Sequence, residues 1–307
     1  MGFLLYGIGI GITYMADQGL KKSKKLTYSQ YGRLYNEKNI NADLLIIGNS
    51  RASTSIDPAV LNGMLPFRTY NLGLNGGSVE LQHWIFDLYM DCNTKYPQAI
   101  LINIDWMSID KNSKVINRKR DLIPWCGDKR WKPFLERYHI FSRAEKYIPL
   151  WKYRGRRWMM QEGLKEYWGI FHSGFGGDIV SYKDGYICLD DRLPMSGLLF
   201  GSLSVPDISD DFSLTDQFLQ RCFQKNIQVI FFYPPIYQTY RESYEVSFRA
   251  LSLIREYAGA RHIPFLDYTQ RPECNDPSYF RDYWHLNRKG AAWFSRILAD
   301  DLNFYYL

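Results

Sequence analysis

A serine and a histidine in this sequence have neighbours that could make them a nucleophile and its base. Ser50 closely follows Leu44-Leu45-Ile46-Ile47, a continuous apolar run, with only Gly48-Asn49 between them. His285 stands three residues after Asp282, near the other end of the chain. A serine hydroxyl is a poor nucleophile until a base accepts its proton, and the base needs an acid to orient it. These residue types therefore suit acyl transfer through a covalent intermediate.

The apolar run before Ser50 is typical of a strand that is buried on both faces of a parallel sheet. Four further segments read as strands, at residues 69–72, 99–104, 229–233 and 264–266. Because helical patterns separate them, we predict βαβ units and a three-layer α/β/α sandwich around a central, mostly parallel sheet. Ser50 would then lie at the carboxyl edge of the sheet, where open α/β folds bind their ligands.

Three motifs in this chain occur together. They are Gly48-Asn49-Ser50 after the first strand, N-x-x-x-x-G over Asn71–Gly76 after the second, and D-x-x-H-L-N-x-x-G over Asp282–Gly290 before the last helix. The combination resembles the SGNH (GDSL-type) hydrolase superfamily, whose fold is flavodoxin-like. The resemblance covers about residues 42–106 and 225–303.

The resemblance implies a role for each motif residue. Ser50 would be the nucleophile, His285 the general base and acid, and Asp282 the residue that orients the histidine. The amides of Ser50 and Gly76 would donate to the oxyanion, and no metal or organic cofactor would be required.

The sequence also departs from that family's pattern. Asn49 stands where the family has an aspartate, and Asn103-Ile104-Asp105-Trp106 stands where it has G-x-N-D. The asparagine that would complete the oxyanion hole is therefore missing at its usual spacing, and losing one such donor typically costs about 10²- to 10³-fold in rate. Asn75, Asn103 or the amide of Arg51 are the candidate replacements, with Asn75 assigned first.

Arg51 stands directly beside the candidate nucleophile. A guanidinium at this place could bind a carboxylate or phosphate of an acidic sugar in a bidentate manner. We therefore assign it a substrate-binding role, with a structural salt bridge at the start of a helix as the alternative.

The bulk composition excludes several classes of protein. With 46% hydrophobic and 23% charged residues in 307, the chain is typical of a globular protein rather than of a disordered or collagen-like one. Five cysteines without C-x-x-C spacing indicate neither a zinc cluster nor a complete disulfide framework. We find no metal-ligand motif and no nucleic-acid-binding module, so neither partner is expected.

The N-terminal stretch from Phe3 to Ala16 is apolar and uncharged. As a helix, Met1–Ala16 would span about 24 Å, short of the roughly 30 Å of a bilayer core. We interpret residues 1–20 as a shortened membrane anchor, 21–41 as a connector and 42–307 as the catalytic domain; a buried helix is the alternative for the first. The lysine-rich segment 21–25 favours the cytoplasmic side of a membrane and conflicts with an exported domain.

A basic, aromatic segment at about residues 110–211 does not fit the alternation of strands and helices. Between Lys111 and Met160 there are 15 Lys and Arg against 4 Asp and Glu, in a chain whose net charge is +6. We predict a helical insertion, whose charge and aromatic residues would suit contact with anionic lipid or with an acidic polymer. The alternative is a solvated helical cap whose aromatic residues form a core.

With this insertion and a membrane segment, the chain is most similar to membrane-anchored SGNH members of bacterial cell-surface polysaccharide systems. That resemblance implies an O-acyl, in particular O-acetyl, esterase or acyltransferase in the periplasm or at the cell surface. Its partners would be an acylated carbohydrate, the membrane through the N-terminal helix, and a membrane-bound acyl-donor protein. The alternatives are a non-catalytic assembly protein that binds an acidic polysaccharide or lipid headgroup, and a lipid esterase.

Overall fold

The computed structural model describes most of the 307 residues. The described ranges are 2–23, 30–34, 37, 39–111, 113–170, 182–189, 207–238 and 245–305. The chain divides into two compact units, each assembled from two segments. Unit 1 comprises Met1–Lys38 and Ile116–Val180, and unit 2 comprises Asn39–Val115 and Ser181–Leu307.

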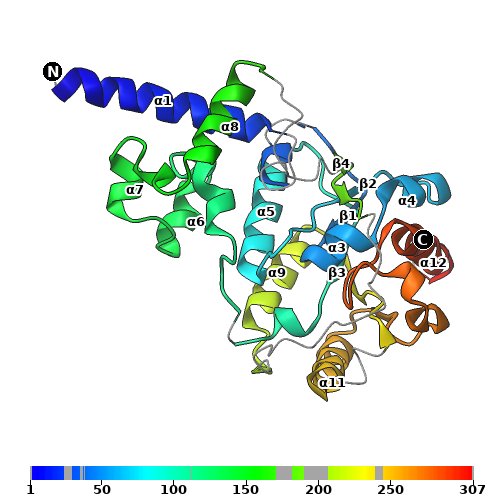
Figure 1. The fold of residues 1–307 in the computed structure, drawn as a ribbon. Helices are drawn as coiled ribbons and strands as arrows, with labels where there is room; N and C mark the ends of the chain where they lie inside the picture. Colours follow the sequence, from blue (N-terminus) through cyan, green and yellow to red (C-terminus); the bar gives the residue numbers. More distant parts are fainter. Residues whose placement is uncertain are drawn as a thin grey trace. The chain divides into compact units, whose positions relative to one another are not determined.

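Unit 2 is built on a five-stranded sheet, which Figure 1 shows near its centre. The strands are β1 (Leu44–Ile47), β2 (Thr69–Asn71), β3 (Ala99–Asn103), β6 (Gln228–Tyr233) and β7 (Phe265–Asp267). All neighbours pair in parallel in the order β2-β1-β3-β6-β7. The predicted parallel sheet and the five predicted strand positions are thus confirmed.

The register of the sheet brings the ends of its central strands together. Ile47 at the end of β1 pairs with Ile102, and Asn103 at the end of β3 pairs with Phe232. All four residues of β1 are buried, as the unbroken apolar run predicts for a central parallel strand. The segments that follow β1, β3 and β6 therefore emerge at one edge.

Helices cover both faces of this sheet, as the three-layer prediction requires. On one face lie α3 (Ser50–Ser55), α4 (Pro58–Met64) and α12 (Arg288–Tyr305), which Figure 1 shows together. They share a core with alternate strand residues such as Leu101 and Phe232. Phe231 points to the opposite face, where it stacks on Tyr257.

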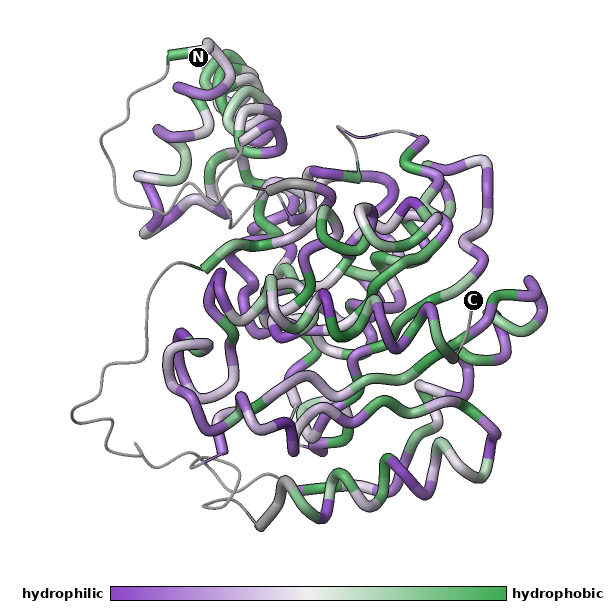
Figure 2. The backbone as a smooth tube through the Cα atoms, turned by 90° about the vertical axis from the view of Figure 1, so that its right-hand side faces the viewer, coloured by the Kyte–Doolittle hydropathy of each residue, from purple (hydrophilic) through white to green (hydrophobic). Residues whose placement is uncertain are grey.

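The opposite face carries α5 (Val79–Asp91), α9 (Ser213–Gln224) and α11 (Glu245–Ala260). Figure 2 shows hydrophobic and hydrophilic residues alternating along α11, the lowest helix in both views. Ala250 and Ile254, four residues apart, are fully buried, so α11 packs through one apolar stripe.

Local signals in the sequence explain where these helices begin. The side chain of Asp57 accepts a hydrogen bond from the amide of Ala59, and Pro58 occupies the first helical position of α4. The side chain of Ser78 caps α5 in the same way, at the amide of Leu81. Such caps satisfy amides that have no partner inside the helix.

Several short elements complete unit 2. They are the 3₁₀ turns η1 (Trp106–Ser108), η4 (Pro272–Asn275) and η5 (Pro277–Tyr279), and the antiparallel pair β4 (Tyr182–Lys183) and β5 (Tyr186–Ile187).

Unit 1 joins the N-terminal helix to the basic segment. Its elements are α1 (Gly2–Lys22), η2 (Lys119–Trp125), α6 (Lys132–Arg137), α7 (Arg143–Tyr147), η3 (Trp151–Tyr153) and α8 (Arg157–Tyr167). Helices α1 and α8 cross at small residues, since a Cβ added to Gly163 would lie 2.2 Å from the carbonyl oxygen of Ala16. No larger residue fits at Gly163 without separating the two helices.

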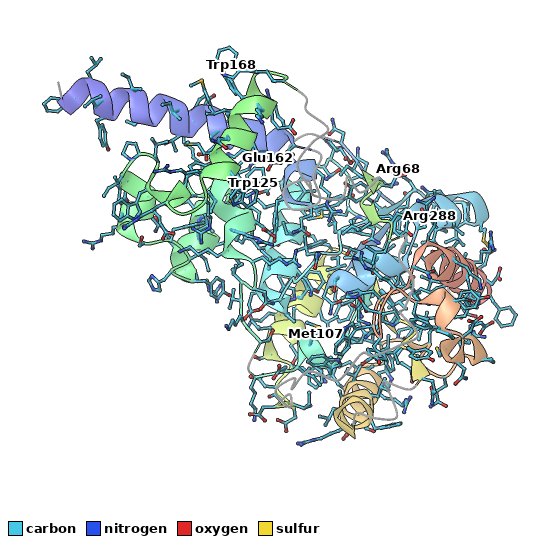
Figure 3. All side chains as sticks on the ribbon, viewed as in Figure 1. Arg68, Met107, Trp125, Glu162, Trp168 and Arg288 are labelled. Carbon is cyan, nitrogen blue, oxygen red and sulfur yellow. The ribbon has the colours of Figure 1, made fainter. Side chains whose placement is uncertain are left out.

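The aromatic residues of unit 1 fall into two groups. Trp125 and Trp131 are fully buried, with ring centroids 6.2 Å apart, and form part of its core. Trp158 is 52% exposed, and Trp168, labelled in Figure 3, lies at the surface too. The predicted helical character of the segment is confirmed for residues 119–167, whereas residues 182–187 of the predicted insertion form the antiparallel pair β4 and β5. Residues 112, 171–181 and 190–206 of the predicted insertion lie outside the described residues.

The predicted membrane anchor is wrong. None of the helices in the described ranges has the length and apolarity needed to cross a bilayer, which also contradicts the membrane-anchored localisation. The apolar stretch ends within α1 at Asp17. The carboxylate of this residue accepts hydrogen bonds from Lys152 Nζ and Tyr153 Oη, each at 2.6 Å. Lys24 and Lys25 of the predicted lysine-rich segment lie outside the described residues.

Acid should destabilise unit 2 through His83 on α5. Its imidazole stacks on the ring of Phe218, with centroids 4.5 Å apart. Burial, assisted by the charge of Arg221, lowers the pKa of His83 from 6.5 to about 3. Between these two pH values the unfolded chain binds a proton that the folded chain does not, so folding stability falls as the pH falls. The loss at pH 4 relative to pH 7 is on the order of 3 kcal/mol.

We expect His83→Phe, which keeps a stacked ring but cannot be protonated, to remove that part of the acid sensitivity. The free energy of unfolding from urea titrations at pH 7, 5.5 and 4 measures it. His262→Asn, at an exposed position, is the matched control and should retain the acid sensitivity of the wild type. Equal pH dependence in His83→Phe and wild type would contradict the assignment.

Candidate active site

Ser50 is the first residue of α3 and follows β1 through a two-residue turn. Asn49 caps the helix, since its Oδ1 accepts a hydrogen bond from the amide of Arg51 at 2.9 Å. The amide of Arg51, one of the candidate oxyanion donors, is therefore already engaged. The serine side chain stands partly exposed at the carboxyl edge of the sheet.

The structure brings Ser50, His285 and Asp282 together. His285 Nε2 lies 2.8 Å from Ser50 Oγ, although the two residues are 235 positions apart. His285 Nδ1 lies 2.9 Å from both carboxylate oxygens of Asp282. A carboxylate only accepts hydrogen bonds, so Nδ1 carries the proton and Nε2 is left to accept one from the serine hydroxyl. This is the arrangement that activates a serine nucleophile.

The loop before α12 holds Asp282 in its ionised form. Its Oδ1 accepts hydrogen bonds from the backbone amides of Trp284 at 3.0 Å and His285 at 2.9 Å. Burial alone would raise the pKa of Asp282, but the hydrogen bond and charge of His285, together with the two amides, lower the pKa below its usual value. Asp282 can therefore stabilise a protonated imidazole at neutral pH.

The loop between β2 and α5 lies against the nucleophile turn. The amide of Leu74 donates to the carbonyl oxygen of Gly48 at 2.9 Å, which fixes the loop beside Ser50. Gly76, with φ at +72°, adopts the left-handed conformation that glycine tolerates best. The oxyanion roles of Gly76 and Asn75 on this loop stay predictions. Asn103 is 1% exposed, and neither polar atom of its side chain has a hydrogen-bond partner among the described residues.

Asn49 and Asp105 are two residues at which the sequence departs from the pattern that it resembles, and their side chains contact each other. The Nδ2 atom of Asn49 lies 3.2 Å and 3.0 Å from the two carboxylate oxygens of Asp105. Asp105 also caps η1 by accepting from the amide of Met107 at 3.0 Å. An amide and a carboxylate thus face each other beneath the nucleophile turn, and the carboxylate cannot donate to an oxyanion while it is ionised.

Arg51 is placed in the interior and not where a substrate could reach it. Its guanidinium is 2% exposed, with NH1 3.1 Å from Asp105 and NH2 2.7 Å from the carbonyl oxygen of Pro234. It also lies 4.6 Å from the ring centre of Tyr233. The structure corrects the substrate-binding assignment of Arg51, because the buried charge is engaged in the salt bridge given as its alternative.

The buried pair of Arg51 and Asp105 should matter strongly for stability. Removing one partner leaves an uncompensated charge in the interior, which typically costs about 3–5 kcal/mol. We therefore expect Asp105→Ala to lower the free energy of unfolding, measured by urea titration, by that amount. The double variant Arg51→Met/Asp105→Ala should lose less than the sum of the two single changes.

The matched control is Lys111→Ala, which breaks a surface pair with Asp207 whose side chains are 57% and 59% exposed. Such exposed pairs contribute about 0–1 kcal/mol. If Asp105→Ala costs no more than this control, the buried pair is not a source of stability.

Sequence reasoning assigned no role to two tryptophans beside the site. Trp106 follows Asp105 directly, and Trp284 stands between Asp282 and His285. Their ring centroids lie 6.0 Å apart. Their position next to candidate site residues was the available signal, but nothing in the sequence showed that the two rings meet.

Comparisons with known proteins give low similarity throughout. No family model and no curated protein matches the chain. Among solved structures, a proposed acylhydrolase from Bacteroides fragilis has a TM-score of 0.41 and 12% identity, covering 87% of this chain and 88% of its own. A GDSL-like lipase from Bacteroides thetaiotaomicron has a TM-score of 0.38 and 13% identity, covering 84% and 87%. A lipase/acylhydrolase from Enterococcus faecalis has a TM-score of 0.35 and 10% identity, covering 84% and 94%.

Proposed function

We propose that this chain is a serine-dependent esterase or acyltransferase of SGNH type. The observation that carries the proposal is the hydrogen-bonded series from Ser50 Oγ through His285 to Asp282, with spacings of 2.8 and 2.9 Å. These distances are within the range in which a base accepts the proton of a nucleophile.

In the first half of the reaction, Ser50 Oγ attacks the carbonyl carbon of an ester while its proton moves to His285 Nε2. The carbonyl π electrons move to the oxygen, and backbone amides near Ser50 stabilise this oxyanion. The oxyanion then collapses, the bond to the alcohol breaks, and the proton on Nε2 passes to the departing oxygen. Ser50 is left as an acyl ester.

In the second half, water or another hydroxyl attacks the acyl group and gives its proton to His285 Nε2. Collapse of the second oxyanion returns the proton to Ser50 Oγ and releases an acid or a new ester. Hydrolysis and transfer use the same residues and differ only in the acceptor that reaches the acyl-enzyme. We propose an O-acyl group, in particular an O-acetyl group on a carbohydrate, as the substrate, following the resemblance in the sequence.

The test uses the purified full chain with a fluorophosphonate probe and with p-nitrophenyl acetate. We expect stoichiometric labelling, located on Ser50 by peptide mass spectrometry, and turnover of the ester that the label abolishes. Labelling at another serine, or no labelling of a protein that is folded by circular dichroism, would overturn the proposal.

A second function is favoured by Asp105, which occupies the place of an oxyanion donor with a buried carboxylate. In this second function, the chain is a non-catalytic protein of the same fold that binds a polysaccharide. Under this alternative the chain binds saccharide and neither reacts with the probe nor turns over ester.

A further inference from the structure

Two indole rings lie together beside the candidate active site. Trp106 begins η1 at the end of β3, and Trp284 immediately precedes His285 in the loop before α12. The ring centroids are 6.0 Å apart and the rings are tilted by 44°. Residues 178 positions apart in the sequence thus meet at the carboxyl edge of the sheet (106 and 284).

Both tryptophans are held at positions that depend on the site itself. The amide of Trp284 donates to Oδ1 of Asp282, the same oxygen that contacts His285. Trp106 lies in a turn whose ends are fixed by a reciprocal cap between Asp105 and Ser108. Met107 of this turn, labelled in Figure 3, has its sulfur 3.9 Å from Asn49 Nδ2. The tryptophan pair is therefore fixed relative to the turn that carries Ser50.

The two rings are neither fully buried nor fully exposed. Trp125 and Trp131 are completely buried in unit 1, whereas Trp106 and Trp284 keep part of their surface in solvent. Partly exposed aromatic groups beside a reacting pair provide apolar contact area at the place where a substrate must lie.

A sugar ring fits this surface better than an acyl chain does. A pyranose has an apolar C–H face that packs on an indole ring, while its hydroxyl groups stay in water. An alkyl chain on a partly exposed pair would leave much of its own apolar surface in contact with water, at an unfavourable cost per unit area. The observed partial exposure therefore favours an amphipathic ring.

We infer that Trp106 and Trp284 form the saccharide-binding subsite of this protein, which takes the pyranose ring that carries or accepts the acyl group. The inference rests on the proposed function for the role of the sugar, but not for its binding. An unacylated saccharide should bind without any reaction.

Binding of cellotetraose, xylotetraose and chitotetraose to the full chain provides the test, with Kd measured by isothermal titration calorimetry. We expect at least one of them to bind at millimolar concentration, and Trp106→Ala to weaken it about tenfold, as expected for loss of an aromatic contact. Trp106→Phe, which keeps a ring face, should bind within about threefold of wild type by the same reasoning. Trp158→Ala, at an exposed tryptophan of unit 1, is the matched control and should bind like wild type.

The outcomes separate this inference from the proposed function. Saccharide binding that depends on Trp106 in a protein that does not react with the fluorophosphonate supports the subsite and overturns the hydrolase proposal. Ester turnover without binding of any of the three saccharides, or with equal binding by Trp106→Ala and Trp158→Ala, overturns the subsite and leaves the hydrolase proposal standing. If Trp106→Ala selectively lowers kcat/KM for p-nitrophenyl octanoate relative to the acetate, the rings contact the acyl chain and the saccharide assignment is wrong.

Discussion

Replacing Ser50 by alanine is expected to lower kcat for p-nitrophenyl acetate by about 10⁶-fold and to abolish fluorophosphonate labelling. The reason is the loss of the protein atom that forms a covalent bond to the acyl group in the proposed mechanism. The fold should be retained, because the serine side chain is partly exposed and its Oγ contacts His285 rather than the core. Initial rates with enzyme in excess measure the residual turnover.

The matched control is Ser53→Ala in the same helix. Its hydroxyl donates to the backbone carbonyl of Ser50 at 3.0 Å and does not contact His285. This variant should retain labelling and turnover within a few-fold of wild type. Should Ser50→Ala and Ser53→Ala react alike, Ser50 is not the nucleophile.

Asp282→Asn is expected to lower kcat by about 10⁴-fold with little change in the fold. The asparagine side chain still accepts from backbone amides, but its NH₂ group can meet Nδ1 only when that nitrogen is unprotonated. The imidazole then carries its proton on Nε2, the atom that must accept one from Ser50. The loss should appear in kcat more than in KM, because Asp282 stabilises the imidazolium that forms during the reaction.

Asp276→Asn provides the control for this second change. Asp276 caps η5 by accepting from the amide of Ser278 at 2.8 Å, so it has the same local hydrogen-bonding role without a histidine. We expect full activity from it. An Asp282→Asn enzyme that keeps more than about a tenth of the wild-type kcat would show that the carboxylate does not orient His285, given the size of the effect in serine enzymes.

The sheet could be predicted because its signals are local. A central parallel strand is buried on both faces, so Leu44–Ile47 appears in the sequence as an unbroken apolar run. The start of α4 was equally visible, since Asp57-Pro58 combines a side-chain cap with a proline at the first helical position. The proximity of Ser50 and His285 follows from the same topology, because both lie where the chain leaves or enters a helix at the carboxyl edge.

The role of Arg51 could not be read from its neighbours in the sequence. A guanidinium beside a serine suits a ligand and a buried carboxylate equally well. The partner, Asp105, lies 54 positions away, just after the end of β3. Only the pairing of β1 with β3 brings the two residues together. Interactions that depend on strand pairing leave no local pattern.

The first helix was misinterpreted because its composition fits both a membrane segment and a helix that packs against another helix of the same unit. The apolar stretch from Phe3 to Ala16 resembles part of a membrane segment, and its packing partner, α8, begins more than a hundred residues later. The close contact at Gly163 depends on the absence of a side chain, which hydropathy does not register. Asp17, the first charged residue, lies within the predicted anchor of residues 1–20 and is bound by Lys152 and Tyr153.

The pairing of Asp17 with Lys152 limits how this protein can be shortened for laboratory production. Lys152 is 5% exposed, and its ammonium group is neutralised by the carboxylate of Asp17 in α1. Trimming the first twenty-odd residues, the usual remedy for an apolar N-terminus, would remove that carboxylate and uncover the glycine surface of α8. Lys152 would then lose its counter-ion and α8 its packing partner, so the full chain is the better starting material for every experiment above.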